Sequence, residues 1–134
     1  MVNAAKPICF VATRQSAAAR QFYEGTLELK LTSDDPFALV FDLNGTMLRV
    51  QKVQQHAPAQ HTVLGWEVKD IQAAVKQLAT KGARFEHFAG LGQDASGIWT
   101  SPSGARVAWF KDPDGNTLSL TQFQPAKAPA TTSL

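Results

Sequence analysis

Arginine, glutamine and hydroxyl side chains alternate with apolar residues in two β-rich segments of this sequence. Arg49 and Gln51 lie in the first segment, and Ser119 and Thr121 lie in the second. Arginine supplies a permanent cation with N–H donors, while amides and hydroxyls supply directional hydrogen bonds. A few such groups on an otherwise apolar surface are typical of a small-molecule site. The pattern favours ligand binding, and no serine–histidine–aspartate arrangement for nucleophilic catalysis is evident.

The elements that would position these side chains occur in the order β-α-β-β-β twice along the chain. In the first half Ser16 caps the helix and Asn44-Gly45 closes a hairpin, and in the second half Asp70 caps the helix and Gly82 ends it. We therefore predict an α+β fold of two βαβββ modules in one domain, with an antiparallel sheet covered by helices on its outer face. The expected strands are residues 8–13, 37–43 and 46–53, then 62–68, 84–88, 99–101, 106–111 and 117–123; the domain spans 1–124, with modules at about 6–53 and 61–124, a linker at 54–60 and a tail at 125–134.

Strand alternation and the two hairpins assign side chains to opposite faces of the sheet. The loop at Asn44-Gly45 pairs Phe41 with Leu48, so Arg49 points the other way. A three-residue loop with Gly115 in the left-handed region pairs Phe110 with Leu118, and Trp109 with Ser119. The residues expected beneath the helices are Phe41, Leu48, Trp66, Phe110 and Leu118, with Cys9 on the same face. The residues expected to bind a ligand on the open face are Phe10, Arg49, Gln51, His61, Val63, Trp109, Ser119 and Thr121.

Composition narrows the classes of partner. The net charge is +2 and the basic residues are scattered, so the sequence predicts no nucleic-acid partner. Apolar runs fall short of the ~20 residues that span a bilayer, and no signal peptide precedes the first strand, so we expect a cytoplasmic protein. Cys9 is the only cysteine, which excludes an intrachain disulfide and a cysteine-based zinc site. His56 and His87 are expected in solvent, and turn chemistry accounts for Asp112 and Asp114.

Residues 107–120, VAWFKDPDGNTLSL, resemble the closing hairpin of the vicinal oxygen chelate superfamily, which includes glyoxalase I, bleomycin resistance proteins and extradiol dioxygenases. Residues 19–23 through 27–29 are similar to that family's first helix, and residues 68–71 are similar to the start of its second. The resemblance covers roughly residues 6–124. It implies a cup-shaped sheet that holds a ligand and often a divalent metal, in a protein that usually forms a homodimer.

The resemblance also implies where metal ligands would stand. The family's four positions correspond to Ile8, Arg49, Val63 and Ser119. Isoleucine and valine offer no donor atom, and arginine offers no lone pair to a cation. We therefore expect no metal cofactor. The alternative is one divalent ion held after a register slip of two residues, which would bring His61 and Gln51 to ligand depth, with Glu67 further along the same strand.

These observations favour a metal-free protein that binds a small molecule, similar in logic to the bleomycin resistance branch that sequesters an antibiotic. Aromatic rings with one arginine suit a planar aromatic ligand that has an anionic or carbonyl edge. One alternative is a metal-dependent enzyme of the same superfamily, a glyoxalase or other lyase, an isomerase or a dioxygenase. A further alternative is a module without a small ligand, whose open face is solvated or forms a dimer interface.

Overall fold

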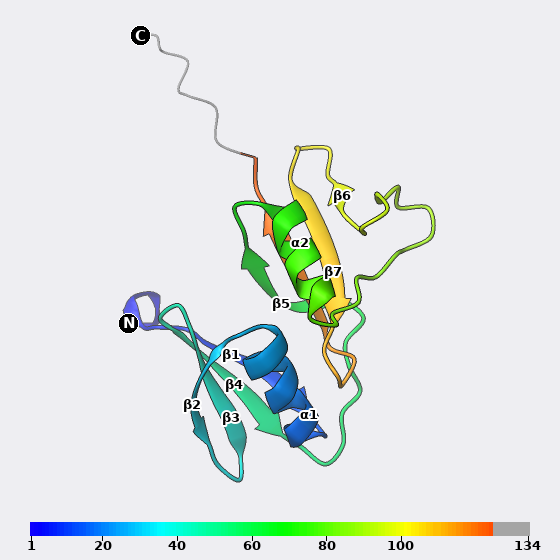
Figure 1. The fold of residues 1–134 in the computed structure, drawn as a ribbon. Coiled ribbons are helices and arrows are strands. Elements are labelled where there is room, and N and C mark those ends of the chain that lie inside the picture. Colours follow the sequence, from blue (N-terminus) through cyan, green and yellow to red (C-terminus); the bar gives the residue numbers. More distant parts are fainter. Residues whose placement is uncertain (125–134) are drawn as a thin grey trace.

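A computed structural model describes residues 1–124 of the chain, and the predicted tail at 125–134 lies outside the described residues (Figure 1). A short 3-10 turn at Val2–Ala4 precedes the first strand. The first half contains β1 (Ile8–Thr13), α1 (Ser16–Arg20) with a π-helical continuation (Gln21–Thr26), β2 (Lys30–Asp34), β3 (Ala38–Leu43) and β4 (Thr46–Lys52). The second half contains β5 (Thr62–Glu67), α2 (Ile71–Thr80), β6 (Trp99–Thr100), β7 (Arg106–Lys111) and β8 (Thr117–Gln122).

The strands described form one four-stranded sheet in each half, in the orders β1-β4-β3-β2 and β5-β8-β7-β6. The predicted α+β class is confirmed, but the sheets are mixed rather than antiparallel throughout. β1 pairs with β4, and β5 pairs with β8, in parallel, because in each half the chain crosses over a helix before it returns beside the first strand. Residues 84–88 form only one bridge, between Phe85 and Phe110, instead of the short strand expected.

Both predicted hairpin registers are confirmed. Asn44 and Gly45 have positive φ values of 51° and 97°, as a tight type I′ loop requires, and Phe41 lies opposite Leu48. In the second hairpin Gly115 has φ 84°, and Trp109 lies opposite Ser119. Because side chains alternate across a strand, each register fixes which residues face the helices and which face away.

The core lies between the sheets and the helices, and α2 crosses β7 in Figure 1. Phe41, Leu48, Phe110 and Leu118 have no exposed surface, as expected. Trp66 differs from its prediction, since it is only partly buried. It packs against the core, but it stands on the edge strand β5 and also lines a recess between the two halves. Cys9 is likewise half-buried against the core.

The helices begin in different ways. Asp70 caps α2 as predicted, because its carboxylate accepts a hydrogen bond from the N–H of Ala73 at 3.1 Å. The prediction that Ser16 caps α1 is wrong. Ser16 is the first helical residue, and the preceding Gln15 makes no side-chain cap. Instead, Thr13 Oγ1 accepts a hydrogen bond from the N–H of Gln15 at 3.0 Å, which supports the chain as it enters the helix.

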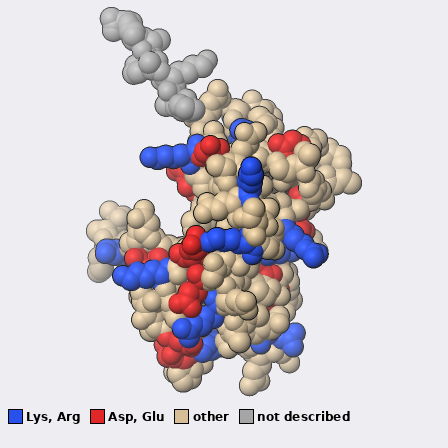
Figure 2. Space-filling view, in the orientation of Figure 1, with Lys and Arg blue, Asp and Glu red and all other residues tan. Residues whose placement is uncertain are grey.

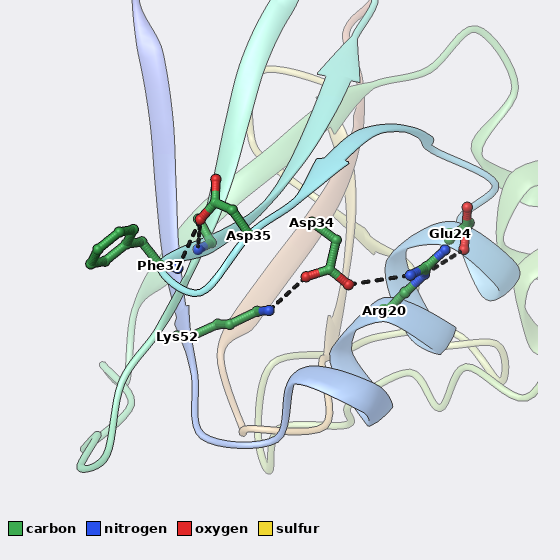
Figure 3. Close-up of polar contacts among 7 residues, drawn as sticks. Arg20, Glu24, Asp34, Asp35, Phe37 and Lys52 are labelled. Atoms are coloured by element: carbon green, nitrogen blue, oxygen red, sulfur yellow. Dashed lines mark hydrogen bonds and ion pairs between the residues drawn. The ribbon is translucent and has the colours of Figure 1, made fainter.

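An ion-pair chain ties α1 to the first sheet (Figure 3). Asp34 accepts from Lys52 Nζ at 2.6 Å and from Arg20 at 3.2 Å, and Arg20 also contacts Glu24 at 3.1 Å. The hydrogen bond from Lys52 is the largest cause that holds the pKa of Asp34 below its usual range. These side chains are partly exposed to solvent, which screens their charges, so the ion pairs fix orientation more than they stabilise the fold. Figure 2 shows charges of both signs mixed over this side of the molecule.

Candidate ligand-binding face

The side of the sheets away from the helices, here called the open face, presents several large apolar side chains to solvent. Ile8, Phe10, Met47 and Val63 are 48%, 51%, 41% and 38% exposed. They come from β1, β4 and β5, and the edge strands β1 and β5 contact each other at the junction of the two halves. Exposed apolar residues that lie together on adjoining strands are a common feature of interaction surfaces, so this face is a candidate binding site.

Arg49 lies in the first-sheet part of this face. It is paired across β1 with Phe10 and across β3 with Val40, and it forms no ion pair with any residue between 1 and 124. Gln51 follows on the same face and is exposed. The arrangement therefore offers a guanidinium outside any ion pair beside an exposed phenyl ring, with the carboxylate of Asp35 as a more distant opposite charge. Such a pair suits a planar ligand that carries negative charge.

The second-sheet part of the open face is occupied by aromatic rings. Trp109 packs 6.0 Å from Trp99 and 5.6 Å from Phe88, measured between ring centroids. Ser119, opposite Trp109, is only 7% exposed, and Thr121 is half-buried. These rings fill much of the surface on which we expected a ligand. The position of Trp99 could have been predicted from the sequence by pairing β6 with β7. The position of Phe88 could not, because it lies in an irregular segment without an alternating pattern of apolar residues.

The loop that carries Phe88 is held in place by one amide. Gln93 donates to the carbonyl oxygens of Glu86 and Gly97 at 2.8 and 2.7 Å, and its own oxygen accepts from the N–H of Phe88 at 2.6 Å. Asp94 then accepts from Ser96 and from the N–H of Ile98, which lowers the pKa of its carboxyl. The aromatic wall formed by Phe88, Trp99 and Trp109 is therefore held by this loop at Phe88 and by β6 and β7 at the two tryptophans.

A pocket of about 280 Å³ remains on the open face at the junction of the halves. It unites Phe10, Gln51 and Val63, three of the residues expected to bind a ligand. The other five, Arg49, His61, Trp109, Ser119 and Thr121, do not line it; His61 is exposed just before β5. The full lining is Phe10, Val11, Ala12, Gln51, His56, Ala57, Ala59, Val63 and Asn116.

His56 corrects a prediction. Instead of standing free in solvent, it is half-buried, and its Nε2 lies 2.7 Å from Asn116 Oδ1. The partner lies in the β7–β8 turn, 60 residues away, so no local pattern could have revealed the contact. His87 is exposed, as expected.

The β7–β8 turn also joins the two halves. The sequence assigned Asp112 and Asp114 only to forming the turn, whereas both also bind residues of the first half. Asp114 accepts from the hydroxyl of Thr13 at 2.5 Å and from the N–H of Arg14 at 2.8 Å. The hydroxyl of Tyr23 donates to Asp112 Oδ2 at 2.6 Å in the interior. Burial, and then the charge of Asp112, raise the pKa of Tyr23 far above its ordinary value. The tyrosine therefore stays a proton donor, and the turn is fixed against β1 and α1.

The positions implied as metal ligands make a poor donor set. Ile8 and Val63 are apolar, Arg49 is a cation, and the hydroxyl of Ser119 is the only oxygen among the four. Within residues 1–124, no three His, Cys, Asp or Glu side chains gather closely enough to hold a metal ion. The residues present at these positions therefore do not fit a divalent cation.

Comparisons with known proteins agree on the class. The family model of the Glyoxalase/Bleomycin resistance protein/Dioxygenase superfamily matches residues 7–120, and the chain belongs to this superfamily. No curated protein matches the sequence.

Solved structures resemble the fold at low sequence identity. Lactoylglutathione lyase from Agrobacterium tumefaciens is 16% identical with a TM-score of 0.68, over 89% of this chain and 93% of that one. A putative glyoxalase family protein from Bacillus anthracis is 17% identical with a TM-score of 0.69, over 92% and 100% of the chains. A glyoxalase/bleomycin resistance protein from Catenulispora acidiphila is 20% identical with a TM-score of 0.68, over 90% and 100%. Among the residues described, no helix is long and apolar enough to cross a membrane.

Proposed function

We propose that this protein binds a small planar apolar molecule on its open face without a metal ion. The observation that carries the proposal is the exposure of Phe10 and Val63 around a pocket, next to the unpaired cation of Arg49. Burying such apolar groups against a ligand is favourable by roughly 25 cal/mol per Å². Neither residue contributes to the core, so their exposure has no use in folding.

The pocket limits the size of the part of the ligand that it encloses. At about 280 Å³ it is slightly smaller than most drug-sized sites, so it suits a body of one or two rings. Stacking on the ring of Phe10 contributes about 0.5–1.5 kcal/mol beyond area burial. A charge-assisted hydrogen bond from Arg49 contributes about 1.5–3 kcal/mol. An aromatic natural product such as an antibiotic, sequestered rather than transformed, fits these requirements.

The binding residues divide into two groups in this proposal. Phe10, Gln51 and Val63 surround the bound ring, and Arg49 meets its anionic or carbonyl edge. Trp109, Ser119, Thr121 and His61 contact those parts of a ligand that extend beyond the pocket. A one-ring ligand would then depend on the first group only.

We further propose that the protein is a cytoplasmic homodimer. Its single cysteine is free, which suits a reducing compartment. Met47 and Ile8 lie on the open face but do not line the junction pocket, so a second copy can cover them. Light scattering at micromolar concentration should give the mass of two chains, and a monomer would contradict this assembly.

The binding proposal is tested with a panel of one- and two-ring aromatic carboxylates and quinones, measured by equilibrium dialysis. Phe10→Ala should weaken binding of both kinds of ligand about tenfold. Arg49→Gln should weaken binding of the carboxylates about tenfold or more and weaken binding of the uncharged quinones less. Phe37, 76% exposed near the β2–β3 turn, provides the matched control, because Phe37→Ala removes an exposed ring away from the open face. Equal losses in the Phe10 and Phe37 variants would contradict the site.

The alternative function is a metal-dependent lyase, isomerase or dioxygenase of the same superfamily, with one divalent ion held by His61 and Gln51. Both side chains are exposed, Gln51 on β4 and His61 just before β5, whereas Glu67 stands at the other end of β5, roughly 20 Å from His61, and cannot share the ion. Elemental analysis after dialysis against nickel, zinc, iron and manganese separates the two proposals. One equivalent of bound metal, lost in His61→Ala, would favour the enzyme.

A further inference from the structure

The junction pocket is lined by a histidine, His56, whose ring is held by a hydrogen bond to a buried asparagine. His56 comes from the segment between the two halves, and its Nε2 lies 2.7 Å from Asn116 Oδ1. Both residues line the pocket together with the exposed Phe10 and Val63. The question is which ring nitrogen carries the proton, because that determines what the imidazole can offer to a ligand.

The amide of Asn116 answers this question through its other contacts. Its Nδ2 donates to the carbonyl oxygen of Ala12 at 2.9 Å and to Asp112 Oδ2 at 2.8 Å. Both amide hydrogens are therefore used, and the reversed orientation would place an oxygen against two acceptors. Asn116 Oδ1 is thus the atom that meets His56. Since an amide oxygen only accepts, Nε2 of His56 must carry a hydrogen and donate it.

Asn116 is itself held rigidly. It is 2% exposed, and its backbone N–H donates to Asp112 Oδ1 at 2.9 Å. Asp112 also accepts from the protonated hydroxyl of Tyr23. A ring nitrogen that is bonded to a fixed acceptor determines the tautomer of the whole imidazole. Neutral His56 therefore carries its lone pair on Nδ1, and no hydrogen bond within residues 1–124 uses that atom.

We propose that His56 determines the specificity of the junction pocket by accepting a hydrogen bond at Nδ1 from a ligand. The proposal rests on the proposed function, and it narrows the ligand to an apolar ring that carries an O–H or N–H donor, such as a phenol or an aryl amine. Asn116 is the positioning residue, because it acts only through His56. Gln51 also lines the pocket, but its side chain is exposed and its amide can rotate to present either a donor or an acceptor. It therefore imposes no preference for a ligand that donates a hydrogen bond.

Two probes of nearly the same shape test the preference. Naphthol carries a hydroxyl donor, and its methyl ether carries none. The wild-type protein should bind naphthol roughly 3- to 10-fold more tightly than the ether in equilibrium dialysis. His56→Phe keeps a ring of similar size but has no acceptor, so it should bind both probes equally. His87→Phe, the same change at an exposed histidine that does not line the pocket, is the matched control and should keep the preference for naphthol.

Long-range proton–nitrogen NMR of the wild-type protein provides a second measurement that needs no variant. It should find the hydrogen of the neutral His56 ring on Nε2 and the lone pair on Nδ1, and the Nδ1 signal should shift when naphthol is added but not with the ether. The opposite tautomer would overturn the inference. Equal binding of both probes by the wild type, or a preference that survives in His56→Phe, would overturn it while leaving the proposed function intact. Failure of both probes to bind at all would contradict the proposed function, and the inference with it.

Discussion

Removing the hydroxyl of Tyr23, which is buried and donates to Asp112, should destabilise the folded protein. Asp112 is 6% exposed, and its two oxygens accept four hydrogen bonds, from Tyr23, from the N–H groups of Asp114 and Asn116, and from the Asn116 amide. No cation pairs with this carboxylate within residues 1–124, so these donors replace the water that it lost. Tyr23→Phe removes the shortest of the four bonds.

The magnitude follows from the charge of the acceptor. A hydrogen bond to a charged group contributes about 1.5–3 kcal/mol, and here the acceptor stays buried when its donor is removed. Urea denaturation followed by tryptophan emission should therefore give a free energy of unfolding lower by about 2 kcal/mol in Tyr23→Phe. Ser103→Ala, which removes an exposed hydroxyl, should change it by less than about 0.5 kcal/mol.

Alkaline pH provides an independent readout on the same residue. An unfolded tyrosine ionises near about pH 10, whereas burial, and then Asp112, raise the pKa of Tyr23 above that value in the folded protein. The folded state therefore holds its proton more tightly, and stability is lost as pH rises past about 10, by up to about 1.4 kcal/mol per unit. Tyr23 is the only tyrosine, so Tyr23→Phe should remove this part of the pH dependence. Equal alkaline slopes in both proteins, or a loss below about 0.5 kcal/mol at neutral pH, would refute the reasoning.

Two further changes test the packing of the second half. Gly65→Ala would place its Cβ 2.5 Å from Ser119 Oγ, so the free energy of unfolding in urea should fall by about 1–3 kcal/mol. The double variant with Ser119→Ala should recover most of this loss, and additive effects of the two changes would contradict the contact. Asp70→Ala removes the cap of α2 and should cost about 1 kcal/mol, whereas Asp70→Ser should recover most of it, and no change in either would show that the cap is not formed in solution.

The parts of the fold that could be predicted from the sequence are those set by neighbouring residues. The register of β3 with β4 depends on the loop at Asn44-Gly45, where both residues adopt positive φ. Asn-Gly is the pair that most favours such a loop, so the sequence predicts the register from these two residues. The same holds for the loop that Gly115 closes. Alternation then places Phe41 and Phe110 in the core and Arg49 on the open face. Such inferences need only a few residues of context.

The junction pocket could not be predicted, because its walls meet only after the two halves dock. His56 contacts Asn116, which is 60 residues away in the sequence, and Asp114 accepts a hydrogen bond from Thr13, which is 101 residues away. The aromatic wall has the same origin, since Phe88 reaches Trp109 only because Gln93 shapes the loop. The strand at Lys30–Asp34 was also missed, because only Leu31 of its five residues is apolar, so no alternation marks it.

The core described above is continuous across both halves, and this has a consequence for the history of the chain. Buried residues of the first half, Tyr23 and Phe41 among them, form one cluster with Phe110 and Leu118 of the second. A half of about 50–60 residues buries too little apolar surface to be securely stable alone. An ancestral polypeptide that encoded a single half would therefore have gained stability by associating with an identical chain, and a gene fusion would make that association permanent. Denaturation of the present chain should accordingly proceed as one cooperative event.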